Sequence, residues 1–322
     1  MLDNVTNNDT AVASFHSLLV NKYGLETAPI SPTERRLRCM GHILNLAAKS
    51  LLFESDAEAF ECETTELSDN DAAIEREFQH WRQAGSIGKI HNLVAFIHCS
   101  PQRKEAFCSI QLNVLKWPHS ILPHTDNATR WNSVFLMLND VLNFREPIEL
   151  YLPRCCTFKT MDKKDKQQFK LERHCMLTDD DWEELIHLHA LLYDFWELTL
   201  QMQGNVTKKL QEDATNMAER HQTVYGKSDE YIFRRSTSTS NSISTSTSFF
   251  DETSEDGTLF NVLPAFDHLL SKLETAKTMY TNDSRFTTSI NLAWKKMDDY
   301  YNQRDLSKTY LVAAVLDPRV KL

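Results

Sequence analysis

The stretch LTDDDWEELIHLHALLYDFWELTLQMQGN, residues 177–205, places apolar side chains at helical spacing along its whole length. Thr178 can cap such a helix, and the aspartates at 179–181 fill its first turn, where the helix dipole favours negative charge. Similar patterns recur along the chain, which has only seven glycines and nine prolines, so the sequence predicts a mainly α-helical protein. In this stretch we expect the following stripe to face a core: Trp182, Leu185, Leu188, Leu192, Phe195 and Leu198.

Further helices are predicted on both sides of this stretch. One covers roughly residues 10–22 and stops near Gly24, another runs through 43–51, and a third through 90–97 before Pro101. Helical spacing returns in 259–280 and 289–303. The short segment RRLRCM, residues 35–40, could be a strand that leads directly into the next helix, which would give the chain a local α/β start.

Two segments are predicted to connect these elements without packing. Residues 54–78 carry an excess of Asp and Glu and show no hydrophobic period, as in a solvated loop. Residues 236–256 collapse into a Ser/Thr-rich run that is too polar to bury anything, which is typical of a disordered linker.

The overall charge limits how the chain can meet nucleic acid. A formal charge of −10 and a pI near 5.7 argue against a surface that grips phosphates everywhere, so any such contact must be local. Candidate basic patches are residues 34–38 and residues 158–173, although acids interrupt the second, which favours a solvated face or loop.

The cysteines and apolar runs bear on the compartment and on zinc. Seven irregularly spaced cysteines without a leading apolar segment indicate a reducing compartment, and no run approaches the ~18 apolar residues of a membrane span. Cys39 and His42 have the spacing of half a zinc site. No zinc is expected, because the available second half fits no familiar zinc spacing: Cys155, Cys156, His174 and Cys175.

Two positions carry open alternatives. Asp3 precedes an Asn-rich turn and a helix, so it could be a metal ligand held at the end of a strand or simply a helix N-cap. In NATRWNSVF, residues 127–135, Trp131 could stack on a nucleobase or pack at a helix start with Val134 and Phe135.

Taken in order, several motifs resemble hAT-superfamily DNA transposases, in the form abundant in filamentous fungi, over nearly the whole chain. The most specific combination is a CxxHxLNL pattern followed by TRWNS and then LDPRxK. The resembling segments are LDNVTNND (2–9), RCMGHILNLAAKSLL (38–52), KIHNLVAFIHCSPQRKEAF (89–107), DNATRWNSVFLML (126–138), LTDDDWEELIHLH (177–189), FWELTLQMQGN (195–205), VLPAFDHLLSKLE (262–274) and LVAAVLDPRVK (311–321).

The resemblance implies a ribonuclease H-like α/β core interrupted by a large α-helical insertion. On this interpretation the partial core covers residues 1–54, the insertion covers 55–235 and resumes at 257–322, and the 236–256 linker lies between. Both ends look cut, since the family's N-terminal zinc-finger module and C-terminal dimerisation region have no counterpart.

The resemblance also implies roles for single residues. Asp3 matches the second of three acids that hold two magnesium or manganese ions for phosphoryl transfer, and the other two acids have no match here. His42 matches a motif beside that metal site. Arg130, Trp131 and Asn132 match the segment whose Trp stacks on a base displaced from the transposon end.

These features predict a truncated or relic hAT-type transposase-like protein that binds DNA but does not catalyse transposition alone. The competing hypothesis is a domesticated helical module that binds proteins or DNA, and the acidic charge favours protein partners slightly. The expected location is the nucleus, or the cytoplasm if the chain lacks an import signal. No membrane contact is expected, and a fold with an incomplete sheet should be marginally stable near its N-terminal end.

Overall fold

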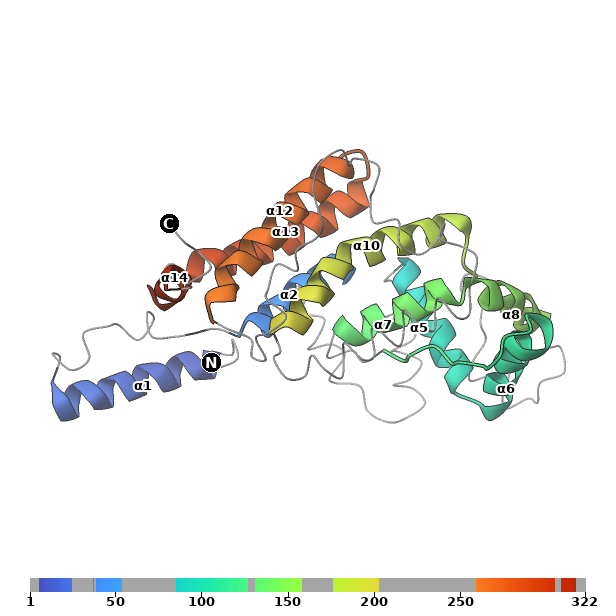
Figure 1. Ribbon diagram of the computed structural model, residues 1–322, viewed down its shortest axis with the longest axis horizontal. Helices are drawn as coiled ribbons and strands as arrows, with labels where there is room; N and C mark the ends of the chain where they lie inside the picture. The colour runs from blue at the N-terminus through green and yellow to red at the C-terminus, as the bar shows by residue number, and fades with distance from the viewer. Residues whose placement is uncertain are drawn as a thin grey trace. The chain divides into compact units, whose positions relative to one another are not determined.

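The computed structural model describes residues 6–24, 37, 39–53, 85–126, 131–157, 176–202, 259–304 and 308–316. Within these ranges every regular element is a helix, which confirms the mainly α prediction (Figure 1). The helices are α1 (Thr6–Tyr23), α2 (Met40–Phe53), α5 (Gly85–His98), α6 (Pro101–Ser109), π-helix η2 (Ile110–Val114), α7 (Trp131–Asn143), α8 (Arg145–Thr157), α10 (Asp179–Met202), 3₁₀-helix η4 (Leu259–Asn261), α12 (Val262–Met279), α13 (Ser284–Arg304) and α14 (Lys308–Val315).

The strand predicted at 35–40 is wrong at the residues of that segment that the structure describes. Leu37 and Cys39 lie in no regular element, and Met40 is the first residue of α2. The apolar side chains that follow have a helical period and are buried as a helix, so the local pattern favoured α2 over an extended start. A ribonuclease H-like α/β core therefore stays a prediction.

The chain divides into two compact units. Unit 1 contains Met1–Ala57, Asp194–Leu210 and Thr245–Leu322, and unit 2 contains Glu58–Tyr193 and Gln211–Ser244. Helix α10 contributes its first part to unit 2 and its last part to unit 1. The four domain boundaries inferred from the resemblance stay predictions, and the acidic loop at 54–78, the basic segment at 158–173 and the linker at 236–256 lie outside the described residues.

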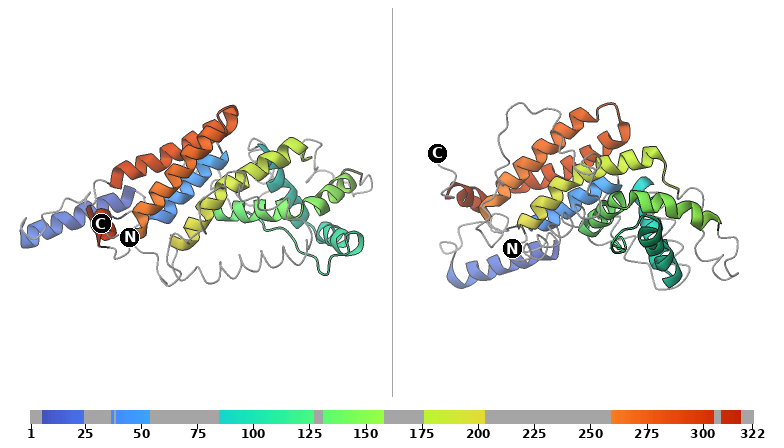
Figure 2. Two further views of the ribbon diagram at one scale, coloured as in Figure 1. Left: turned by 45° about the horizontal axis from the view of Figure 1, so that its top comes forward. Right: turned by 45° about the vertical axis from the view of Figure 1, so that its right-hand side comes forward.

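In unit 1, α12 and α13 form a helical hairpin, and α2 packs along α13 (Figure 2). The turn between the two hairpin helices is closed by the ring of Tyr280, which stacks on Phe286 with 4.9 Å between centroids. Asp283 Oδ1 accepts a hydrogen bond from the backbone N–H of Phe286 at 3.3 Å and so satisfies a free donor at the start of α13. The core is built from apolar stripes on three helices: Ile43, Leu46, Ala47 and Leu51; Phe266, Leu269 and Leu273; Ile290, Ala293 and Met297.

Helix α1 also belongs to unit 1 and ends where the sequence predicts. Gly24 has a φ of +83° and its N–H donates to the carbonyl of Val20, which is the left-handed ending that glycine adopts most readily. The side chains of Phe15 and Leu18 remain 61% and 65% exposed.

In unit 2, α5 packs on α6 and α7, and α8 packs on α6 and α7. Pro101 begins α6, where its missing N–H costs no intrahelical hydrogen bond. Phe107, which is fully buried, meets Phe144 and Tyr151 edge to face. After the π-helix η2, Lys116 adopts a φ of +58° and turns the chain into an irregular segment that leads towards α7.

Helix α10 confirms the prediction made from its sequence in bounds, cap and stripe. The hydroxyl oxygen of Thr178 accepts from the N–H of Asp181 at 3.2 Å, and Asp181 Oδ2 accepts from the N–H of Thr178 at 2.7 Å. This is a reciprocal capping arrangement that satisfies two donors at once. Every residue of the predicted stripe, from Trp182 to Leu198, is buried.

Candidate nucleic-acid interface around the start of α7

The structure places some of the sequence-predicted site residues in different parts of the molecule. Trp131 and Asn132 are the first two residues of α7 in unit 2. His42 lies in the first turn of α2 in unit 1 and is partly exposed. Asp3 and Arg130 lie outside the described residues. The interface described below is therefore built from unit 2 alone.

Trp131 is buried against its own helix and the unit behind it. Only 2% of its surface is exposed, and its ring lies 6.1 Å from that of Phe135, one turn further along α7. This position corresponds to packing at a helix start, one of the two alternatives for this residue. Stacking on a base stays a prediction, and it would require the indole to leave this position.

The row of rings continues from α7 to α10. His189 stacks on Phe135 with centroids 5.0 Å apart and planes inclined by 18°. Burial lowers the pKa of His189 to about 4, so the imidazole is neutral near pH 7. Its Nε2 lies 3.1 Å from Oδ1 of Asn139, and since a carbonyl oxygen only accepts, Nε2 carries the hydrogen.

The irregular segment 120–126, which we call the strap, is held by side chains instead of a backbone ladder. Gln111, fully buried in η2, donates from Nε2 to the carbonyl of Ile121 at 2.9 Å and accepts from the N–H of Ile121 at 2.7 Å. Nε2 of His98 donates to the carbonyl of Pro123 at 2.8 Å. Backbone groups of an irregular segment need such partners when they are partly buried.

Two histidine–carboxylate pairs hold the second half of the strap. Asp140 on α7 accepts from both the backbone N–H and the Nδ1 of His124. Nδ1 of His91 on α5 lies 2.8 Å from each carboxylate oxygen of Asp126. The side chains of this second pair are only 11% and 5% exposed, so solvent screens their attraction little.

Sequence reasoning missed the strap. The signal that could have revealed part of it is the seven-residue spacing of His91 and His98, which puts both imidazoles on one face of α5. No comparable signal marks Gln111, because its role depends on where the chain returns after η2.

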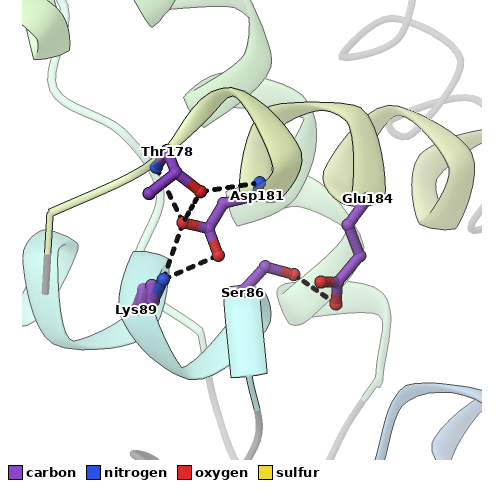
Figure 3. Close-up of polar contacts among 5 residues, drawn as sticks. All are labelled: Ser86, Lys89, Thr178, Asp181 and Glu184. Atoms are coloured by element: carbon purple, nitrogen blue, oxygen red, sulfur yellow. Dashed lines mark hydrogen bonds and ion pairs between the residues drawn. The ribbon is translucent and has the colours of Figure 1, made fainter. Parts of the chain in front are cut away.

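A second polar cluster joins α5 to the start of α10 (Figure 3). Nζ of Lys89 lies 2.7 and 2.6 Å from the two oxygens of Asp181, and Ser86 Oγ donates to Glu184 at 2.6 Å. Burial opposes ionisation of Asp181, but the hydrogen bonds from Lys89 and Thr178 outweigh it and lower the pKa of this carboxyl. The cluster fixes one helix against another and completes the α10 cap.

The described part of the chain offers no obvious metal centre. Within those ranges no group of three or more His, Cys, Asp and Glu side chains is arranged to hold a metal ion. Asp3 lies outside them, so a role for magnesium or manganese at Asp3 stays a prediction. No helix in the described ranges combines the length and apolar character that a bilayer span requires.

Comparison with known proteins finds a related family over the middle of the chain. Residues 37–191 match the family described as "ZBED1 RNase-like helical domain", which is hAT-related. This range contains α2, the strap, α7 and His189.

A curated relative from Talaromyces stipitatus, "Putative transcriptional regulator tpeD", is 27% identical over 201 residues. The matched region is 62% of this chain, and the chain spans about a fifth (21%) of that relative's length. No solved structure matches.

Proposed function

We propose that this chain is a helical protein of hAT-transposase descent that contacts DNA through the segment at the start of α7. The observation that carries the proposal is the match of residues 37–191 to an hAT-related helical domain, with the TRWNS motif of the resemblance inside it. The location proposed for such a protein is the nucleus.

The contact is proposed to be local. Arg130 would meet a phosphate, Trp131 would stack on an unpaired base, and Asn132 would add a polar contact. Stacking on an aromatic side chain tolerates any base and contributes about 1–3 kcal/mol. A protein with a net charge of −10 cannot rely on a broad positive surface, so a frayed or hairpin end, where a base is already unpaired, fits this chemistry better than intact duplex.

The proposal is restricted to binding. Of the three acids that the resemblance implies for phosphoryl transfer, this sequence offers a match for Asp3 alone. One carboxylate does not hold two divalent ions, so we propose no strand cleavage or joining by this chain alone. On this view, it is a truncated or relic form of the transposase.

The test is binding of the full chain to a fluorescent hairpin with frayed ends, compared with a blunt duplex, across a salt series. We expect preference for the frayed hairpin and a shallow dependence of log affinity on log salt concentration. Arg130→Gln should reduce that slope by about one, whereas a change on another face, Lys277→Gln, should leave it unchanged. Absence of binding at low salt would overturn the proposal.

A second candidate function is binding to a protein partner, and one observation favours it. Helix α14 exposes an apolar face on which Leu311, Val312, Val315 and Leu316 are 53–75% exposed. Such faces often mark protein interaction sites. The relative in Talaromyces stipitatus is named as a transcriptional regulator, a class whose members act with other proteins as well as DNA. Loss of a partner on Leu311→Ser/Val315→Ser, with hairpin binding unchanged, would support this function instead.

A further inference from the structure

The strap is fixed to three neighbouring elements, and its last anchor lies five residues before Trp131. Gln111 and His98 hold its first half, and Asp140 holds His124 to α7 itself. The pair His91–Asp126 instead ties the end of the strap to α5. This pair, which we call the latch, therefore determines whether the chain entering α7 stays fixed to α5.

Trp131 is placed where a small opening would release it. It is the first residue of α7, and the first N–H groups of a helix have no intrahelical partner, so unwinding the first turn breaks few backbone bonds. Two sets of contacts oppose this opening. The ring of Trp131 packs against Phe135 on the inner side, and the latch holds the chain before the helix on the other.

We infer that the His91–Asp126 latch is an autoinhibitory contact that keeps Trp131 buried and so limits its access to an unpaired base. The inference rests on the proposed function. In the structure 2% of Trp131 is exposed, which leaves no ring face for a nucleobase. A ligand that binds only the open state pays for opening, and its apparent affinity falls in proportion to the open fraction. Releasing the latch therefore increases binding instead of decreasing it.

This direction separates a latch from an ordinary structural contact. Loss of a buried pair destabilises a fold wherever it lies, and general destabilisation does not improve binding. The matched control is Asp181→Asn, which breaks another carboxylate–cation contact of α5 in the same unit, with Lys89, away from the strap. If both variants changed DNA binding alike, the effect would come from loss of stability.

The experiment compares the full-length wild type, Asp126→Asn, Asp126→Ala and the Asp181→Asn control. Hydrogen exchange reports on the amides of Ile121 and His124, which the strap contacts protect. Acrylamide quenching, taken as the difference between each protein and its Trp131→Phe version, reports on the indole of Trp131. Anisotropy with the frayed hairpin reports on binding.

We expect Asp126→Ala to speed exchange in residues 120–126, to increase quenching of Trp131 and to tighten hairpin binding about fivefold or more. Asp126→Asn, which keeps an acceptor for His91, should fall between this variant and wild type. The added Trp131→Phe change should remove most of the gain. Neither quenching nor affinity should rise in Asp181→Asn.

Three outcomes overturn the latch: unchanged quenching of Trp131 in Asp126→Ala, weaker hairpin binding by that variant while it remains folded, or a gain that persists without Trp131. If exchange and quenching rise but neither wild type nor variant binds any DNA, the latch stands and the proposed DNA-binding function fails. The two ideas can therefore fail separately.

Discussion

The imidazole of His189 on α10 lies flat on the ring of Phe135 on α7, 5.0 Å away, and Asn139 holds its Nε2 at 3.1 Å. This contact joins two helices that are 46 or more residues apart in sequence, from Phe135 to Asp181 and beyond, through one neutral side chain. Because the imidazole is buried and has an amide carbonyl as its partner, its neutrality is a condition for the packing of unit 2.

His189 predicts acid sensitivity. Its pKa falls from the ordinary 6.5 to about 4 on burial, so below pH 6.5 the unfolded chain binds a proton that the folded chain resists. Stability from this group is complete above pH 6.5 and is lost as the pH falls towards 4, by about 3 kcal/mol in all. Urea unfolding at pH 7.5 and pH 5 should show this loss in wild type and much less of it in His189→Gln, which can still donate to Asn139. Equal losses in both proteins would contradict the prediction.

The α10 cap predicts a smaller effect. Thr178→Ala removes the hydroxyl that accepts from the Asp181 N–H and should lower the free energy of unfolding by about 1 kcal/mol, as for other N-cap losses. Thr178→Ser keeps the hydroxyl and serves as the control, so it should stay within about 0.5 kcal/mol of wild type. A loss of the same size in both would show that the methyl group matters and the hydroxyl does not.

Asp181 predicts a different pH window. Its pKa lies below the ordinary 3.8, so its carboxylate contributes stability above pH 3.8 that is lost as the pH falls through the lower folded-state pKa. Asp181→Asn should cost about 2 kcal/mol at pH 7, because hydrogen bonds from Lys89 and Thr178 to a charged acceptor are weakened together. The difference between wild type and variant should shrink below pH 4. A constant difference down to pH 2 would argue against an ionised Asp181 in the fold.

Trp131 predicts a separation of packing from recognition. Trp131→Ala should lower the free energy of unfolding by about 3–5 kcal/mol, because it empties a buried site next to Phe135. Trp131→Phe fills much of that volume and should cost less, while still weakening hairpin binding, because phenylalanine offers a smaller face for a base. Binding equal to wild type in a folded Trp131→Phe would place DNA recognition elsewhere.

The exposed face of α14 predicts tolerance. Leu316, which is 75% exposed, should accept Leu316→Ser with less than about 0.5 kcal/mol change in stability, whereas the buried Tyr310 on the same helix should not accept Tyr310→Ser. Chemical unfolding of both variants gives the comparison. Strong destabilisation by Leu316→Ser would mean that this side chain is covered by its own chain.

The sequence by itself determined the helices and their buried faces. In α10 the cap, the acidic first turn and the stripe from Trp182 to Leu198 are all local or periodic, and the structure confirms each. The same holds for the stripe of α2 and for the end of α1 at Gly24. Local hydrogen bonding and hydrophobic period act over a few residues, so they can be read without knowing the fold.

Only the tertiary structure decided the candidate site. His91 meets Asp126 across 35 positions, and His189 meets Asn139 across 50, through side chains whose spacing in sequence carries no information about the contact. The sequence left Trp131 with two roles, and the packing of α7 buried it. Such contacts depend on how helices return to one another, because burial and hydrogen-bond partners are set by neighbours in space and not by neighbours along the chain.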